Sequence, residues 1–239
     1  MASTKNLKHR LPVISELPHI TVDATTLKVL QDLVVVENAK FQSVADVNKE
    51  LCGNHHVLAT SVYDAFHQIG LTTSLFSTDT FDLSACGTDQ GGTEVTARQK
   101  RKLVTSDNSP LNELTNTVRT PFYTQHSAVF DKLLCQFKGE PTRLRLVRLD
   151  GKSIVDPHID YDPSYATRVI IPIDATDECV NLFWVKGCVE AHTLKPGKAY
   201  FLNTGFKHAV VNMAKMPRYT FMVTLKGTED IDHLLGPTP

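Results

Sequence analysis

The sequence predicts a mainly β fold with flanking helices, of the double-stranded β-helix (jelly-roll, cupin-like) type. From about residue 140 onward, short segments alternate polar and apolar side chains or are rich in β-branched and aromatic residues. Gly, Pro, Asn or Asp bounds each of these segments. Short strands at this spacing are typical of a sandwich or barrel and not of βαβ units. The expected strands are 142–149, 167–173, 179–185, 198–202, 209–212 and 218–225.

The part of the chain before residue 140 has a mixed, partly helical pattern. Segments 25–35 and 43–51 are each expected to form a short helix. Segment 127–137 is a stronger amphipathic candidate, because its apolar residues recur at helical spacing. Between these helices, residues 77–123 are rich in Ser, Thr, Asp, Asn and Gly. A polar segment of this length within a compact domain is expected to form a loop or a lid over a site.

The length of 239 residues indicates one large domain, or a catalytic core with a modest extension. The expected organisation is a mixed or helical N-terminal region (1–120) packed on the core, a β-helix core (121–228) and a C-terminal tail (229–239). A net charge of -1 does not favour nucleic acid or a membrane surface as the main partner. No apolar run approaches about 18 residues, so no transmembrane helix is expected.

The five cysteines are scattered along the chain and form no CxxC pair. This pattern predicts free thiols in a reducing compartment, and not a disulfide framework or a structural zinc site. The first twenty residues contain no continuous apolar stretch, so no secretory signal is expected. The sequence therefore predicts a cytoplasmic protein.

Three residues of the β-rich half are candidate metal ligands. His158 and Asp160 form an HxD motif, and His208 follows fifty residues after His158. Two imidazoles and one carboxylate form the facial set that holds Fe(II) while leaving positions open for a co-substrate and dioxygen. Alternation along a strand directs residues 158 and 160 to the same face. The sequence predicts His158, Asp160 and His208 as the catalytic metal site; the alternative is that the two histidines are unrelated polar residues.

Two arginines are candidates for binding a carboxylate. Arg218, ten residues after His208, opens the last expected strand. An inward arginine there would need a compensating anion because burying an unpaired charge is costly, whereas an edge arginine would reach solvent. Arg168 begins segment 167–173 and could face the same cavity, where it would contact the co-substrate or a carboxylate of the prime substrate.

Four other side chains, three arginines and a tryptophan, are mostly expected to lie outside the site. Arg143 and Arg145 share one face of their expected strand and Arg148 takes the other, so all three cannot line one site. At least two of the three are expected to be solvated. Trp184, the only tryptophan, is expected in the core.

Residues 142–225 resemble the aspartyl/asparaginyl β-hydroxylase family of iron- and 2-oxoglutarate-dependent oxygenases, which includes proline cis-3-hydroxylase-like enzymes. The segments that carry the resemblance are RLRLVRLDGKSIVDPHID, RVIIPI, LKPGKAYFLNTGFKHAVVN and PRYTFMVTL. The resemblance implies a jelly roll with Fe(II) on His158, Asp160 and His208. It also implies that Arg218 binds the distal carboxylate of 2-oxoglutarate and that Arg168 is a second arginine of the pocket.

The predicted function is that of an Fe(II)- and 2-oxoglutarate-dependent dioxygenase. It would use O2 to hydroxylate an unactivated C–H bond of a small substrate, with a free amino acid as the first choice. One alternative is a hydroxylase of an Asp, Asn or Pro side chain in a peptide or protein. Another is a non-enzymatic cupin-like module that binds a metal or ligand. Asp160 counts against a halogenase, which would need that position vacated for halide. Neither nucleic acid nor a membrane is expected as a partner.

Overall fold

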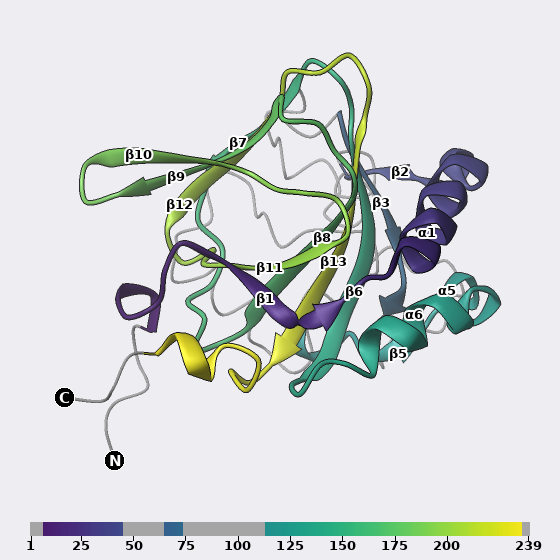
Figure 1. The fold of residues 1–239 in the computed structure, drawn as a ribbon, viewed down its shortest axis with the longest axis horizontal. Coiled ribbons are helices and arrows are strands. Elements are labelled where there is room, and N and C mark those ends of the chain that lie inside the picture. The colour runs from purple at the N-terminus through teal and green to yellow at the C-terminus, as the bar shows by residue number, and fades with distance from the viewer. Residues whose placement is uncertain (1–6, 45–64, 74–112, 236–239) are drawn as a thin grey trace, which may run out of the picture.

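A computed structural model describes residues 7–44, 65–73 and 113–235, which form two packed antiparallel sheets with helices on one side (Figure 1). The larger sheet has seven strands among the described residues. In spatial order they are β1 (Ile14–Thr21), β11 (Lys198–Leu202), β8 (Thr167–Asp174), β13 (Arg218–Lys226), β6 (Glu140–Leu149), β3 (Phe66–Gly70) and β2 (Gln42–Ser43). Most of the predicted helix 43–51 and of the polar segment 77–123 lies outside the described residues.

The smaller sheet lies against one face of the larger sheet. Its four strands among the described residues are, in order, β10 (Cys188–Thr193), β9 (Cys179–Val185), β12 (Lys207–Asn212) and β7 (Ser153–His158). Two short strands, β4 (Thr72–Thr73) and β5 (Val118–Arg119), pair separately.

The strand connections establish the jelly roll. From β6 to β13 the chain alternates between the sheets: β6, β8, β11 and β13 belong to the larger sheet, and β7, β9, β10 and β12 to the smaller one. Repeated crossing between two antiparallel sheets is the double-sheet jelly-roll arrangement. The predicted fold class is therefore confirmed, and each of the six predicted strands is present with bounds that differ by at most two residues.

Strands from the N-terminal region complete the larger sheet. β1 pairs with β11 at one edge, and β3 pairs with β6 near the other. The larger sheet thus contains strands from both sides of residue 120.

No helix within the described ranges is long and apolar enough to cross a membrane.

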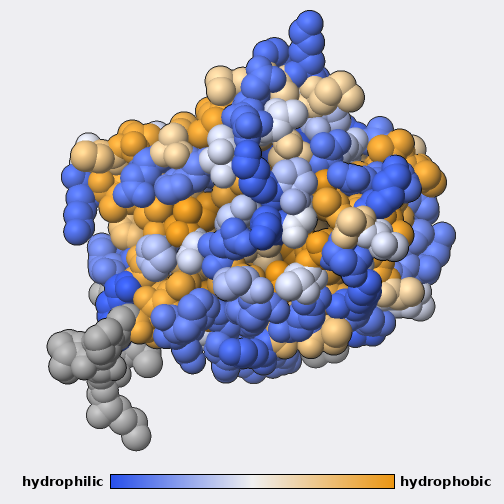
Figure 2. Space-filling view, viewed as in Figure 1, coloured by the Kyte–Doolittle hydropathy of each residue, from blue (hydrophilic) through white to orange (hydrophobic). Residues whose placement is uncertain are grey.

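Three α-helices of the described residues cover the face of the larger sheet that points away from the smaller sheet (Figure 1). They are α1 (Ala24–Val36), α5 (Pro121–Gln125) and α6 (Ser127–Leu134), so the helices predicted at 25–35 and 127–137 are confirmed. Asp23 caps α1 by accepting a hydrogen bond from Thr26 N at 2.7 Å. The other side of α1 also exposes apolar residues, as the space-filling view shows (Figure 2).

Alternation along the larger sheet separates an apolar face from a polar cavity. Leu144, Leu146, Phe221 and Val223 point to the helices and join the main core cluster. Their sequence neighbours on the same strands point instead between the two sheets. Because both faces are covered, polar residues on the inner face are buried and need partners or ligands.

Trp184 is not in the core, so that prediction is wrong. It is half-buried on β9, and Lys207 Nζ lies 5.4 Å from the centroid of its ring. Its neighbour Phe183 faces inward and is buried. Alternation therefore turns Trp184 to the outer face of the smaller sheet.

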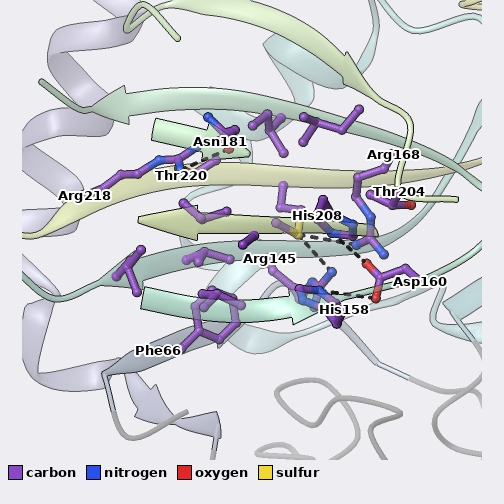
Figure 3. Close-up of a pocket in the computed structure, with 18 of the residues that line it drawn as sticks. Phe66, Arg145, His158, Asp160, Arg168, Asn181, Thr204, His208, Arg218 and Thr220 are labelled. Carbon is purple, nitrogen blue, oxygen red and sulfur yellow. Dashed lines mark hydrogen bonds and ion pairs between the residues drawn. The ribbon is translucent and has the colours of Figure 1, made fainter. Parts of the chain in front are cut away.

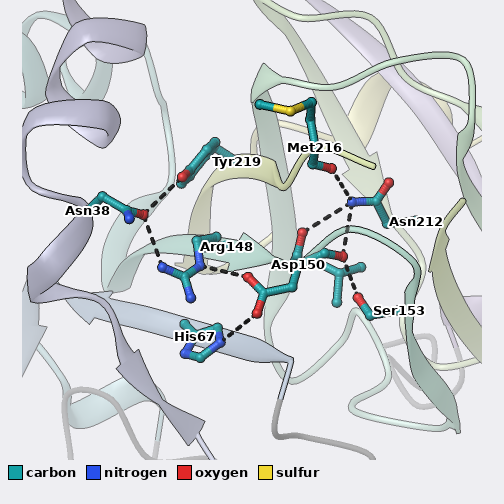
Figure 4. Close-up of polar contacts among 9 residues, drawn as sticks. Asn38, His67, Arg148, Asp150, Ser153, Asn212, Met216 and Tyr219 are labelled. Atoms are coloured by element: carbon teal, nitrogen blue, oxygen red, sulfur yellow. Dashed lines mark hydrogen bonds and ion pairs between the residues drawn. The ribbon is translucent and has the colours of Figure 1, made fainter. Parts of the chain in front are cut away.

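A polar cluster of Asn38, His67, Arg148, Asp150 and Tyr219 joins β3, β6 and β13 (Figure 4). Asp150 accepts a hydrogen bond from Arg148 Nε at 2.9 Å and contacts His67 Nε2 at 3.1 Å. Arg148 Nη1 and the Tyr219 hydroxyl both donate to Asn38 Oδ1 at 3.0 Å. Arg148 is thus committed to this cluster and points away from the space between the sheets.

Asp230 anchors the segment that follows β13. Its carboxylate accepts hydrogen bonds from the backbone N–H groups of Lys138 (3.2 Å) and Gly139 (2.8 Å) and contacts His19 Nε2 at 2.9 Å. We expect Asp230→Ala to lower the free energy of unfolding by about 3 kcal/mol, because it leaves buried donors unpaired. Urea denaturation measures this change. Asp232→Ala is the exposed control, and an equally small effect of both substitutions would contradict the anchoring role.

Candidate metal and carboxylate site

The inner faces of the two sheets enclose a cavity that contains all five predicted site residues (Figure 3). Apolar side chains such as Val155, Phe183 and Leu202 form part of its wall. Its charged and polar lining residues are Arg143, Arg145, His158, Asp160, Arg168, Asn181, Thr204, His208, Arg218 and Thr220.

His158, Asp160 and His208 converge at one end of this cavity. The two histidines are direct cross-strand partners on β7 and β12, with ring centroids 4.3 Å apart. Asp160 Oδ1 lies 3.6 Å from His158 Nε2, and Asp160 Oδ2 lies 3.8 Å from His208 Nε2. One ligand atom from each residue lies within 4.8 Å of the others. The three side chains can therefore share one metal ion.

Backbone carbonyls orient both imidazoles. His158 Nδ1 lies 2.6 Å from the carbonyl oxygen of Asp156, and His208 Nδ1 lies 3.0 Å from that of Phe206. When Nδ1–H donates to these carbonyls, the lone pair of Nε2 points at the shared position, as metal ligation requires. Burial lowers the pKa of His208 to about 4, so the imidazole is neutral near pH 7.

The segments that carry Asp160 and His208 are also joined to each other. Asp160 N donates to the carbonyl oxygen of Thr204 at 3.0 Å, and Thr204 Oγ1 donates to that of Tyr161 at 3.4 Å. The position of the carboxylate relative to the second histidine is thus set by hydrogen bonds and not by sequence proximity.

Arg218 lies at the opposite end of the cavity from the His–Asp–His cluster (Figure 3). Its side chain is buried, and Nη1 donates one long hydrogen bond to Asn181 Oδ1 at 3.4 Å. Nε has no hydrogen-bond partner among the described residues. Burial lowers the pKa of Arg218 to about 10, which leaves the guanidinium charged near pH 7. A buried cation with this environment is suited to an anionic ligand.

Arg168 lies close to the His–Asp–His cluster (Figure 3). Arg168 Nη1 and Arg145 Nη2 both donate to the thioether sulfur of Met222, at 3.4 and 3.0 Å. Two guanidinium groups therefore lie side by side in this part of the cavity. Arg168 thus faces the same cavity as Arg218.

The prediction that at least two of Arg143, Arg145 and Arg148 are solvated is wrong. Arg143 is 1% exposed and Arg145 is 4% exposed, and both line the cavity. They are buried because β6 lies between β13 and β3 and is covered on both faces. The predicted division of the three side chains between two faces is confirmed, since Arg148 does not line the cavity.

Three further polar lining residues were not predicted: Asn181, Thr204 and Thr220. Thr220 follows Arg218 by two positions on β13, so strand alternation could have identified it as an inward residue. Asn181 lies on β9 and contacts Arg218 across the cavity, and alternation with the inward Phe183 could likewise have identified it.

A scan of protein-family models and a search of curated proteins find no match to the chain. Among solved structures, it is similar to a prolyl-4-hydroxylase from Pseudomonas putida, with 11% identity over 95% of this chain and 98% of that one and a TM-score of 0.48. It is also similar to a prolyl hydroxylase from Trichoplax adhaerens solved with a hypoxia inducible factor peptide fragment. The identity is 10% over 98% of this chain and 91% of that one, and the TM-score is 0.48.

An oxidoreductase of the 2OG-Fe(II) oxygenase family from Burkholderia pseudomallei matches 43% of this chain at 16% identity, with a TM-score of 0.33. The matched part spans about half (54%) of the length of that protein. With identities of 16% or less and TM-scores below 0.5, these three similarities assign no activity to the present chain.

Proposed function

We propose that the chain is an Fe(II)- and 2-oxoglutarate-dependent dioxygenase that hydroxylates an unactivated C–H bond of a small substrate, with a free amino acid as the first choice. The observation that supports this most strongly is the composition of one cavity. It has a two-histidine, one-carboxylate cluster at one end and a buried arginine at the other. The first suits Fe(II) with open positions, and the second suits a carboxylate.

Each of these residues has a defined task in the proposal. His158, Asp160 and His208 would hold Fe(II), which when bound supplies the activation of dioxygen. Arg218 would bind the distal carboxylate of 2-oxoglutarate, with Asn181 and Thr220 beside it. The apolar wall of the cavity would exclude water from the reacting groups.

The proposal for the prime substrate rests on Arg168. Its position near Asp160 and His208 places a guanidinium close to where the substrate would react (Figure 3). A free amino acid brings a carboxylate that fits such a group. The alternative in which Arg168 contacts 2-oxoglutarate, and the alternative of a peptide substrate, are separated by the following measurements.

We expect Arg168→Gln to raise the KM for the prime substrate by about tenfold to a hundredfold, because it removes a charge-assisted hydrogen bond worth roughly 1.5–3 kcal/mol. The KM for 2-oxoglutarate should change little. Steady-state kinetics with each substrate varied in turn measures both values, and Arg168→Lys serves as the charge-conserving control. The opposite pattern would assign Arg168 to the co-substrate.

The proposed function is tested by succinate formation from 2-oxoglutarate. The protein is loaded with Fe(II) without oxygen, exposed to air and offered a panel of free amino acids and short peptides. Succinate formation stimulated by one of these compounds would support the oxygenase and identify its substrate class. A protein that binds metal but has no affinity for 2-oxoglutarate would instead favour the non-enzymatic cupin-like module.

A reducing, cytoplasmic location remains part of the proposal. Its support is that the described cysteines, Cys135, Cys179 and Cys188, are free thiols. An Fe(II) enzyme also benefits from a reducing environment.

A further inference from the structure

The segment 7–13, here called the N-terminal strap, lies against two loops: one that begins with a metal-ligand candidate and one that leads to another. The strap is the purple coil ahead of β1 in Figure 1. The first ligand loop is 160–165, which begins with Asp160. The second ligand loop is 203–206, which leads to His208. Contacts between the strap and both loops are direct, although the three segments are far apart in sequence.

The strap is held to the first ligand loop by Asp162. Asp162 Oδ1 accepts a hydrogen bond from Leu7 N at 3.1 Å, and Oδ2 accepts one from Lys8 N at 3.4 Å. Asp162 Oδ1 also accepts from Ser164 N at 2.9 Å within the loop. The carboxylate of Asp162, two positions after Asp160, thus ties the strap to the first ligand loop.

The strap is held to the second ligand loop by Asn203. Its buried Nδ2 donates to the carbonyl oxygen of Lys8 at 2.9 Å and to that of Pro12 at 3.3 Å. Asn203 N donates to the carbonyl oxygen of Val13 at 2.9 Å, and Lys8 Nζ donates to that of Gly205 at 3.3 Å. The second loop is therefore fastened to the strap through both side-chain and backbone groups.

Phe206 links the strap directly to a candidate ligand. Its ring lies edge-on to His9, with centroids 5.6 Å apart, and Lys8 Nζ lies 5.7 Å from its centroid. The carbonyl oxygen of the same residue accepts the hydrogen bond from His208 Nδ1. The residue that sets the orientation of this imidazole is thus packed against the strap.

All three segments meet at Gly205. A Cβ on this residue would lie 3.1 Å from Lys8 Cβ and 3.2 Å from Asp162 Cα. This spacing is tighter than ordinary van der Waals contact, so the segments are packed as closely as a residue without a side chain allows.

We propose that the N-terminal strap is a positioning element for the metal centre, with Asp162 and Asn203 as its positioning residues. The inference rests on the proposed function, because it assigns the strap to the same His–Asp–His site. Asp160 begins the first ligand loop, whereas His208 lies on β12 directly after the second ligand loop. A metal ion gains affinity when its ligands are already held in place. The strap bridges these loops and so fixes the two ligands relative to each other.

The test compares Asp162→Ala and Asn203→Ala with the wild type in two assays. Mn(II) binding to the metal-free protein, followed by the electron paramagnetic resonance of free Mn(II), is expected to weaken about tenfold in each variant. The Asp160 amide donates a hydrogen bond to the carbonyl oxygen of Thr204. In the metal-free protein, its hydrogen exchange is expected to be at least several-fold faster in each variant than in the wild type. Asp162→Asn retains an acceptor and should recover most of the wild-type behaviour.

Gln136→Ala is the matched control. Three hydrogen bonds join Gln136 to Thr21 at the far end of β1. Gln136 Oε1 accepts from Thr21 N at 2.8 Å and from Thr21 Oγ1 at 3.1 Å, and Gln136 Nε2 donates to the carbonyl oxygen of Thr21 at 3.1 Å. None of the hydrogen bonds of Gln136 reaches either ligand loop. The substitution should leave Mn(II) affinity and Asp160 exchange unchanged. The inference is overturned if the Asp162 and Asn203 variants keep wild-type exchange, or if Gln136→Ala has the same effects as they have.

The two assays separate this inference from the proposed function. A wild-type protein that binds no Mn(II), or binds it equally well after His208→Ala, would contradict the proposed metal site. Exchange of the Asp160 amide still decides in that case whether the strap holds the loops, because this measurement requires no metal.

Discussion

Replacing Asp160 with alanine is expected to abolish Fe(II) binding and substrate-dependent succinate formation while leaving the fold intact. The substitution removes the only carboxylate of the His158, Asp160, His208 cluster, and two imidazoles alone hold Fe(II) weakly. Asp160 lies in a loop after β7 and is partly exposed, so its side chain contributes little to the core. His158→Ala should have the same effect. Metal content after anaerobic reconstitution, the succinate assay and circular dichroism measure the three properties.

Asp156→Ala provides a control on the same strand. Its side chain does not line the cavity, and the backbone carbonyl that contacts His158 Nδ1 is retained. We expect this variant to bind Fe(II) and to form succinate as the wild type does. Full activity in Asp160→Ala or His158→Ala would remove the metal assignment. Equal loss in Asp156→Ala would indicate that disturbance of β7, and not loss of a ligand, is responsible.

Sequence patterns identified two kinds of strand: those with one apolar and one polar face, and those with two apolar faces. β13 and β8 carry dense apolar and β-branched residues, because they lie inside the larger sheet. The strands that were not predicted lack such a pattern. β10 is exposed along almost its whole length, and β1 is an edge strand that contains a proline. An edge strand needs fewer apolar residues, so hydrophobic alternation does not reveal it.

The grouping of His158, Asp160 and His208 could be predicted without a structure, because the residue types that suit Fe(II) are few. Arg145 illustrates the opposite case. Its strand alternates regularly, but the sequence does not show that β3 and β13 flank it on both sides. A regular alternation of arginine with leucine looks like a half-exposed strand until its neighbours are known. Burial of Arg143 and Arg145 is therefore a property of sheet order, which depends on segments far away in sequence.

Replacing Arg218 with methionine is expected to raise the apparent KM for 2-oxoglutarate far more than that for the prime substrate. Truncating one member of a buried charge pair costs roughly 2–5 kcal/mol, which corresponds to at least about 30-fold in affinity. The substitution should not lower the stability of the protein without co-substrate, because it exchanges a buried charge with one long hydrogen bond for an apolar side chain of similar length. Kinetics with 2-oxoglutarate varied and urea denaturation with and without 2-oxoglutarate measure both effects.

Arg148→Met is the matched control, since Arg148 lies on the neighbouring strand β6 opposite Tyr219 and faces the outer polar cluster. It removes hydrogen bonds to Asp150 and Asn38, so it should lower stability while leaving the KM for 2-oxoglutarate unchanged. The two variants are thus expected to show opposite effects. Arg218→Met should lose co-substrate binding but keep its stability, whereas Arg148→Met should lose stability but keep co-substrate binding. An unchanged co-substrate dependence in Arg218→Met would show that the assignment of this guanidinium to the distal carboxylate of 2-oxoglutarate is wrong.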